Sequence, residues 1–191
     1  MKLLAFTLLL CLAACSYNLG HENRSIPGGH KTVFVNMFEN QSQEVGAEAF
    51  FTSALITELQ RSGFVVVTEK DSAEVVIDGL ILDVLNSGSV SIPTFHEVDN
   101  INKEAKSFQA SMFTEYLLTV SANLKVRRTR DNKVIWQTYL QNQRGYRGPL
   151  LKKDGLRSSN PLYNQSTKSQ TMRLLAKDMM AEAFDRLTEN F

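Results

Sequence analysis

The sequence predicts an α+β fold, a two-layer sandwich in which a mixed four- to five-stranded sheet carries two amphipathic helices on one face. Three observations predict it. In two segments apolar residues recur every three to four positions, the period of a helix with one buried side. In the other apolar segments they recur at every second position or form short runs, as in strands. The segments follow the order strand, helix, two strands, polar stretch, two strands, helix.

Residues 1–14 have the features of a secretion signal that is removed from the mature protein. Lys2 supplies a positive charge, and residues 3–12 form a short, almost entirely apolar run. This run is too short for a membrane-spanning helix, which needs about 20 residues. Two small residues follow the run and lead directly to Cys15.

Cys15 is predicted to be the attachment point of a lipid. The stretch Leu12-Ala13-Ala14-Cys15 matches the bacterial lipobox. This resemblance implies lipidation of the Cys15 thiol, cleavage before it and acylation of the new amino terminus. Several acyl chains hold a protein at a membrane, whereas one chain binds only marginally. Because Ser16 and not aspartate follows, we expect anchoring at the periplasmic face of the outer membrane.

The rest of the chain is long enough for one domain with a hydrophobic core. Removal of residues 1–14 leaves 177 of the 191 residues. Residues 15–30 contain asparagine, glycine and proline without periodicity, so we expect a lipidated tether there and a single α+β domain over 31–191. The leader takes Cys11 and the lipid takes Cys15, which leaves no thiol for a disulfide, a zinc site or a nucleophile.

The charges are distributed unevenly, although the formal net charge is only +1. Residues 39–104 carry a net charge of −9, and residues 125–173 carry +10. In one interpretation, the two halves face each other or are simply solvated. In the other, a basic surface faces an anionic partner, which would suit a protein at a membrane. Both interpretations remain open at this point.

The first half of the domain is predicted to contain three strands and a helix. Residues 31–38 are apolar on both sides, which is typical of an interior strand. A helix is expected over about 46–61, and the Ser-Gly pair that follows it provides the C-cap. Residues 64–69 and 73–85 follow as strands, and Gly79 in the second indicates a bulge or a close contact.

The second half begins with a polar stretch and continues with a hairpin. Residues 86–110 contain Pro93 and no sustained period, so we expect a mobile excursion that becomes ordered on assembly. Residues 116–127 alternate between apolar and polar side chains, which predicts a half-buried antiparallel strand. A turn at 129–133 leads to a return strand at 134–141.

The chain ends with a basic loop at 144–163 and a helix at about 164–189. Three methionines in the helix are predicted to be core, although such a stripe can also bind partners. They are Met172, Met179 and Met180. In the return strand, Ile135 and Tyr139 lie on the side of the sheet that the helices need not cover. An exposed apolar sheet face would mark an interface.

Motifs for catalysis or metal binding are absent from the sequence. The histidines lie in the predicted tether and excursion, without metal-pair spacing: His21, His30 and His96. There is no G-x-S-x-G elbow and no phosphate loop. Asp78 and Asp83 could form a buried carboxylate pair, but partners at the strand edge or on the helices are favoured. We expect no enzyme, cofactor or metal and, for an anchored extracytoplasmic protein, no nucleic acid.

Several stretches follow one another in an order known from a lipoprotein family. They are "CSYNLG" after the lipobox, then "VFVNMFEN", "FFTSALITELQRSG", "SAEVVIDGLI", and "TEYLLTVSANLKV" with its return strand "NKVIWQ". Together with the long last helix they resemble the lipopolysaccharide-assembly family, LptE. The resemblance implies a plug inside the large β-barrel translocon LptD. The plug helps the barrel to fold and helps to deliver lipopolysaccharide to the cell surface.

In this family, basic residues near the hairpin between the two paired strands are implicated in lipopolysaccharide contact. The matching stretch here, "RRTRDNK", supplies four candidates: Arg127, Arg128, Arg130 and Lys133. Guanidinium and ammonium groups suit the phosphates of a glycolipid. The alternative is an ordinary solvated hairpin tip. The basic insert at 144–157 departs from the shortest family members.

The first half also resembles other envelope lipoproteins. Penicillin-binding-protein activators and curli-secretion-type assembly factors begin with a similar strand, helix and strand. An activator would dock on a peptidoglycan synthase, usually behind a longer linker than a tether of about 15 residues, which spans roughly 50 Å at most. A curli-type subunit would form a large oligomer. A lipoprotein hydrolase, an enzyme, would show an acyl-enzyme burst with an ester probe, which we do not expect.

Overall fold

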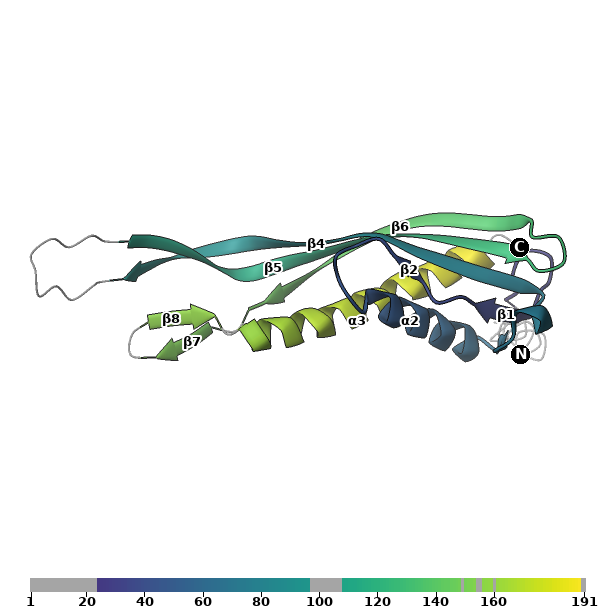
Figure 1. Ribbon diagram of the computed structural model, residues 1–191, viewed down its shortest axis with the longest axis horizontal. Coiled ribbons are helices and arrows are strands. Elements are labelled where there is room, and N and C mark those ends of the chain that lie inside the picture. The colour runs from purple at the N-terminus through teal and green to yellow at the C-terminus, as the bar shows by residue number, and fades with distance from the viewer. Residues whose placement is uncertain (1–23, 97–107, 149, 154–155, 160, 190–191) are drawn as a thin grey trace, which may run out of the picture.

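Two helices lie along one face of a long, open sheet and give the chain an elongated, two-layer α+β shape (Figure 1). The computed structural model describes residues 24–96, 108–148, 150–153, 156–159 and 161–189. The predicted fold class, a mixed sheet with two helices on one face, is confirmed.

Strands and helices alternate in the first half of the described chain, as predicted. The strands are β1 (Thr32–Val35), β2 (Glu39–Asn40), β3 (Val65–Val66), β4 (Val75–His96), β5 (Phe108–Arg128), β6 (Val134–Arg147), β7 (Leu150–Lys153) and β8 (Leu156–Ser159). The helices are α2 (Ala47–Arg61), α3 (Pro161–Thr188) and the short 3-10 helix η1 (Lys70–Ser72). The predicted strand at 31–38 is thus shorter, and a second short strand, β2, follows it.

The main sheet has the strand order β3-β1-β4-β5-β6, and β2 pairs with β4. β1 runs parallel to both β3 and β4, whereas β4, β5 and β6 are antiparallel. The sheet therefore has six strands, including the two-residue β2. β7 and β8 form a separate two-stranded sheet.

The core lies between the helices and the inner face of the sheet. Phe51, Leu55 and Leu59 of α2 are buried. The methionine stripe of α3 is fully covered as well, so its prediction as core is confirmed. Phe64, just after α2, meets the α3 residue Phe184 edge to face, with ring centroids 5.6 Å apart. Each such apolar side chain contributes about 1.5–3 kcal/mol on burial.

Gly79 in β4 provides a close contact, as its position in an apolar strand predicted. A Cβ atom at this residue would lie 2.4 Å from the ring of Phe38. Because only glycine lacks a Cβ atom, only glycine at residue 79 leaves room for this ring. The register shifts of β4 lie further along, first between Ile81 and Asp83 and then between Gly88 and Ser91.

The predicted mobile excursion at 86–110 is wrong for most of its length. β4 continues to His96, and β5 begins at Phe108, so the two strands pair as one long hairpin that extends past the helical layer (Figure 1). The two strands supply each other's hydrogen bonds. This pairing could not be predicted from the polar composition of the segment. Pro93 is accommodated because β4 has no second partner there within the described chain. Residues 97–107, and with them the predicted ordering on assembly, lie outside the described residues.

Two predicted loop segments also prove to be structured. β6 extends to Arg147, and the β7–β8 hairpin occupies much of the predicted basic loop at 144–163. α3 begins at Pro161, three residues before the predicted start. Proline suits this position because the first turn of a helix does not need its N–H group.

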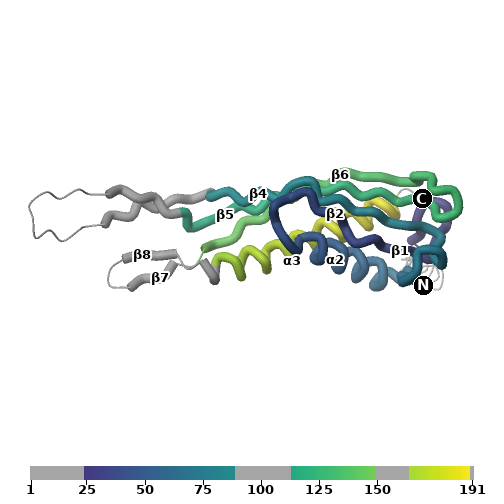
Figure 2. Tube along the Cα trace, viewed as in Figure 1, coloured from purple at the N-terminus to yellow at the C-terminus, as the bar shows by residue number. Residues whose placement is uncertain are grey.

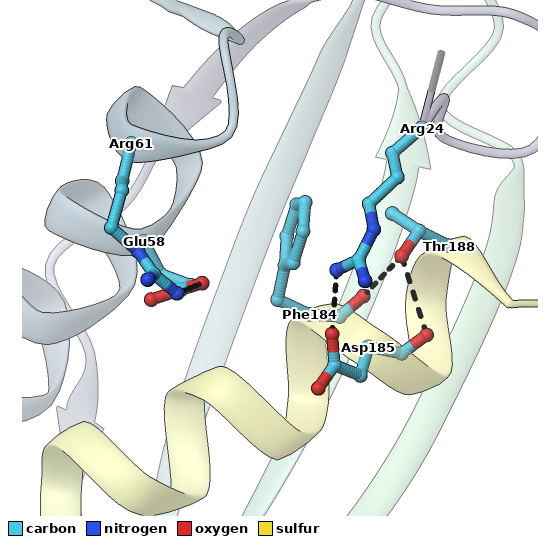
Figure 3. Close-up of polar contacts among 6 residues, drawn as sticks. All are labelled: Arg24, Glu58, Arg61, Phe184, Asp185 and Thr188. Atoms are coloured by element: carbon cyan, nitrogen blue, oxygen red, sulfur yellow. Dashed lines mark hydrogen bonds and ion pairs between the residues drawn. The ribbon is translucent and has the colours of Figure 1, made fainter. Parts of the chain in front are cut away.

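Residues 24–30 pack on the body instead of extending the tether to residue 30. Ile26 is fully buried. Arg24 places its Nη1 atom 2.6 Å from Oδ1 of Asp185 and its guanidinium 5.8 Å from the ring centroid of Phe184 (Figure 3). Thr188, one turn later, donates its hydroxyl to the carbonyl of Phe184 at 3.0 Å. The beginning of the described chain is therefore held at the last turn of α3.

Candidate functional site

The four basic candidates surround the turn between β5 and β6. This turn, β1 and the last turn of α3 lie at the same end of the molecule (Figure 2). Arg128 N donates to the carbonyl of Lys133 at 2.9 Å and closes the hairpin. Asn132 adopts a φ of 55°, a left-handed geometry that asparagine tolerates in turns, and the predicted turn is thus present. The structure thus brings the candidates together, but their side chains differ in what they contact.

Arg127 is engaged within the fold. Its Nε lies 2.5 Å from Oδ2 of Asp78, and its Nη1 donates to Asn132. Asn36 donates to the other oxygen of Asp78 at 2.5 Å. Burial alone would raise the pKa of Asp78, but the hydrogen bonds from Arg127 and Asn36 outweigh it and lower the pKa below its ordinary value. Asp78 and Asp83 do not form a buried carboxylate pair, which the sequence allowed but did not favour, since Asp83 is exposed and Asp78 pairs with an arginine on the neighbouring strand.

Arg128 is only partly available. Its Nη1 lies 3.2 Å from Oδ2 of Asp131, and its side chain is 24% exposed. Its Nε is buried without a hydrogen-bond partner. A guanidinium in this position can still turn one edge to an anion, but it would first have to loosen its contact with Asp131.

Among the four candidates, Arg130 and Lys133 are the two whose side chains are free to bind. Both are exposed. Within the described chain, no ion pair includes either side chain. The candidate set therefore divides into a structural pair, Arg127 and Arg128, and an available pair, Arg130 and Lys133. The sequence alone could not make this division, because it depends on the register that places Asp78 near Arg127.

A cavity of about 590 Å³ lies behind the turn. Its walls include Gly28, His30, Glu74, Thr129 and Arg130. Backbone N–H groups of residues 31 and 32 donate to Glu74 and lower the pKa of its carboxyl group. Because acids and bases share these walls, the cavity has no strong preference for an anion.

Within the described residues, two ion pairs join the acidic and the basic segments of the chain. Asp78 pairs with Arg127, and Glu44 pairs with Lys168. The first interpretation of the uneven charge, in which the halves face each other, is thus correct for these four side chains. Arg130 and Lys133 leave room for the second interpretation at the turn.

None of the described helices is long and apolar enough to cross a membrane. The described residues also contain no cluster of three or more His, Cys, Asp or Glu side chains suited to a metal ion. Cys15, the predicted lipid attachment point, lies outside the described residues, as do His21 and the predicted leader at 1–14.

The sequence profile of LptE, described as lipopolysaccharide-assembly, matches residues 30–190. The chain belongs to the LptE family. The match spans both long helices and all strands of the main sheet, so the described body from residue 30 onward is the family domain. No curated protein matches this LptE-family chain in sequence.

Solved lipoprotein structures are distantly similar to this LptE-family chain. A PelC dodecamer from Paraburkholderia phytofirmans is 10% identical and has a TM-score of 0.47, with 83% of this chain and 89% of that chain covered. A minor lipoprotein from Acinetobacter baumannii is 15% identical, with a TM-score of 0.45 and coverage of 84% and 92%. An uncharacterized lipoprotein B from Nitrosomonas europaea is 11% identical, with a TM-score of 0.45 and coverage of 91% and 90%.

Proposed function

We propose that this chain is the lipoprotein subunit of an outer-membrane lipopolysaccharide translocon. Lipid on Cys15 anchors it at the periplasmic face of the outer membrane, and the body occupies the lumen of an LptD-like β-barrel. It assists the assembly of this barrel and the delivery of lipopolysaccharide to the surface, and it catalyses no reaction. The observation that carries the proposal is the family match over residues 30–190.

The geometry supports a binding role for Arg130 and Lys133. Both cations are exposed at one end of the body, without an ion pair in the described chain. Phosphate groups of lipopolysaccharide are suitable partners for them, because charge-assisted hydrogen bonds to phosphate are among the strongest. Arg127 instead serves the fold, and Arg128 contributes less because Asp131 competes for it.

Affinity purification of the mature lipoprotein from solubilised outer membranes tests the barrel partner. We expect one barrel protein in equal amount, which protects the lipoprotein from protease. Recovery of a peptidoglycan synthase would contradict the proposal and favour an activator. Recovery of large complexes that contain only this chain would favour a curli-type secretion factor.

Lipopolysaccharide binding is tested with the double variant Arg130→Ala/Lys133→Ala. We expect about tenfold weaker binding at low salt, and a smaller difference at high salt because salt screens exposed charges. Lys177→Ala is the matched control, since Lys177 is an exposed lysine of α3 without an ion pair in the described chain. Equal binding by both variants would show that the turn does not hold the glycolipid.

A further inference from the structure

The outer face of the main sheet, opposite the helices, carries four successive cross-strand rows of side chains from β4, β5 and β6. Their register is Leu80–Asn123–Tyr139, Asp83–Ser121–Gln141, Leu85–Thr119–Gln143 and Ser87–Leu117–Gly145. We refer to these residues as the outer rows. Both α2 and α3 lie on the other side of the sheet, so neither helix covers the outer rows (Figure 1).

The outer rows are nearly free of charge. Asp83 is their single charged residue, in a chain of which 21% is Asp, Glu, Lys or Arg. The exposed side of α3 is different, since it carries charged side chains in most of its turns. They include Arg173, Lys177, Asp178, Glu182, Asp185 and Arg186. Depletion of charge is what distinguishes the core of an interface from the remaining surface.

The polar groups of the outer rows have hydrogen-bonding capacity to spare. The side chains of Thr119, Ser121 and Asn123 make no hydrogen bond within the described chain. Tyr139 is 51% exposed and donates its hydroxyl to Gln141 at 2.8 Å. Amides and hydroxyls lose little on desolvation when a partner supplies hydrogen bonds, whereas charged groups lose much more.

The apolar members of the outer rows add contact area without forming a core. Leu85 is 57% exposed. Ile135, which the sequence also placed on this face, instead packs against the core, because the register shifts near the start of β6. The face is therefore mixed, with isolated leucines among amides and hydroxyls, and the apolar patch expected from Ile135 and Tyr139 together does not form.

We propose that the outer rows pack against the polar inner wall of the barrel partner. This inference rests on the proposed function and names the surface that the barrel contacts. The lumen wall of a large barrel is polar, so it offers hydrogen-bond partners to side chains that have none within the described chain. A second copy of the chain fits less well, because homodimer interfaces are more apolar. Two copies face to face would also enclose two Asp83 carboxylates without a base from the outer rows.

Site-specific photo-crosslinking in cells that produce the full lipoprotein tests the contact. A benzophenone-bearing residue replaces Gln141 or Thr119 in the outer rows, or Lys177 on α3 as the control. We expect a product with the mass of the lipoprotein plus one barrel protein from the first two positions, in at least fivefold excess over Lys177. Equal yield from all three positions would overturn the proposal, as would a product with the mass of two copies of the chain.

A charge substitution with a matched control gives a second test. Gln141→Glu keeps the size of the side chain and adds a charge to the outer rows, while Gln170→Glu makes the same change on the exposed side of α3. We expect Gln141→Glu to reduce co-purification of the barrel at least tenfold and Gln170→Glu to leave it unchanged, since an unpaired charge at an interface is costly. Both variants should melt at the wild-type temperature, which excludes misfolding.

The two proposals fail in different ways. If the wild-type lipoprotein recovers no barrel protein, the proposed function is wrong and the outer rows lose their partner. If the wild type recovers the barrel while Gln141→Glu and Gln170→Glu behave alike, only the assignment of the outer rows is wrong. Crosslinks from the outer rows to lipopolysaccharide alone would show that the glycolipid, and not the barrel wall, contacts this surface. That result would overturn the inference.

Discussion

The two faces of β5 differ sharply, although their residues alternate along one strand. On the inner face, Leu118, Val120 and Ala122 are each 0% exposed under the helices. On the outer face, Thr119 and Ser121 are half-buried, and no helix of the described chain covers this side of the sheet. The inner face contributes burial of apolar area, which stabilises the fold. The outer face contributes hydrogen-bonding groups that the fold leaves free. Substitutions on this face can therefore alter binding to a partner without loss of stability of the fold.

Truncation of the inner face should have the largest effect. Leu118→Ala removes a fully buried side chain from the middle of β5 and leaves a cavity. We expect the free energy of unfolding to fall by about 2–5 kcal/mol, measured by urea denaturation. Thr119→Ala, the neighbour on the outer face, is the control and should change stability by less than about 0.5 kcal/mol. Similar losses for both variants would show that the two faces do not differ as described.

Overpacking of the inner face should have the next largest effect. Gly79→Ala places a methyl group 2.4 Å from the Phe38 ring, so the ring must move. We expect a loss of about 1–3 kcal/mol in the free energy of unfolding. Phe38→Leu in the same chain should recover part of it, because the smaller side chain leaves room. Strictly additive losses in the double variant would contradict the contact.

On the outer face, the ion pair between Asp78 and Arg127 should make a smaller, pH-dependent contribution. The pKa of Asp78 is lowered from its ordinary value of 3.8, so the folded state favours the carboxylate. The contribution is therefore complete above the unfolded pKa and is lost as the pH falls through the folded pKa. A double-mutant cycle with Asp78→Asn and Arg127→Gln should give a coupling of about 1 kcal/mol at pH 7 that declines below about pH 4. A coupling that does not change with pH would exclude the ion pair as its source.

The smallest effect is expected at Tyr139, in the outer rows. The residue is 51% exposed, and the one hydrogen bond that its side chain makes within the described chain, to Gln141, is exposed as well. Tyr139→Ala should therefore change the free energy of unfolding by less than about 0.5 kcal/mol in urea denaturation. A loss above about 1.5 kcal/mol would mean that the outer face supports the fold of the isolated chain.

Much of the fold could be predicted because β5 and the two helices have clear local periods. The alternation at 116–127, the stripe of α3 and the glycine after α2, with a φ of 85° at Gly63, all match the structure. The long hairpin could not be predicted, because pairing between β4 and β5 gives order to a segment with weak intrinsic preference. Likewise, nothing in the sequence near Ile26 shows that the tether region is covered by the body.

The sequence predicted that the four basic candidates lie around one turn, but not that they divide into a structural pair and an available pair. The sequence grouped Arg127, Arg128, Arg130 and Lys133 because they surround one turn. Strand alternation places Arg127 on the outer face beside Asp78, 49 positions earlier in the chain, and that proximity depends on the register of β4 and β5. The outer rows were missed for the same reason, since their composition becomes visible only when three strands are aligned.

The attachment of Arg24 to the last turn of α3 determines how the body would bear mechanical load. A lipid at Cys15 would apply tension through a segment of about 30 Å at most, and this tension would first reach Arg24 and Asp185. Beyond this contact the pull would continue through buried Ile26 into β1, which hydrogen-bonds to β3 on one side and β4 on the other. Tension along β1 would act on both of its short ladders in shear, so their hydrogen bonds would share the load instead of breaking one after another.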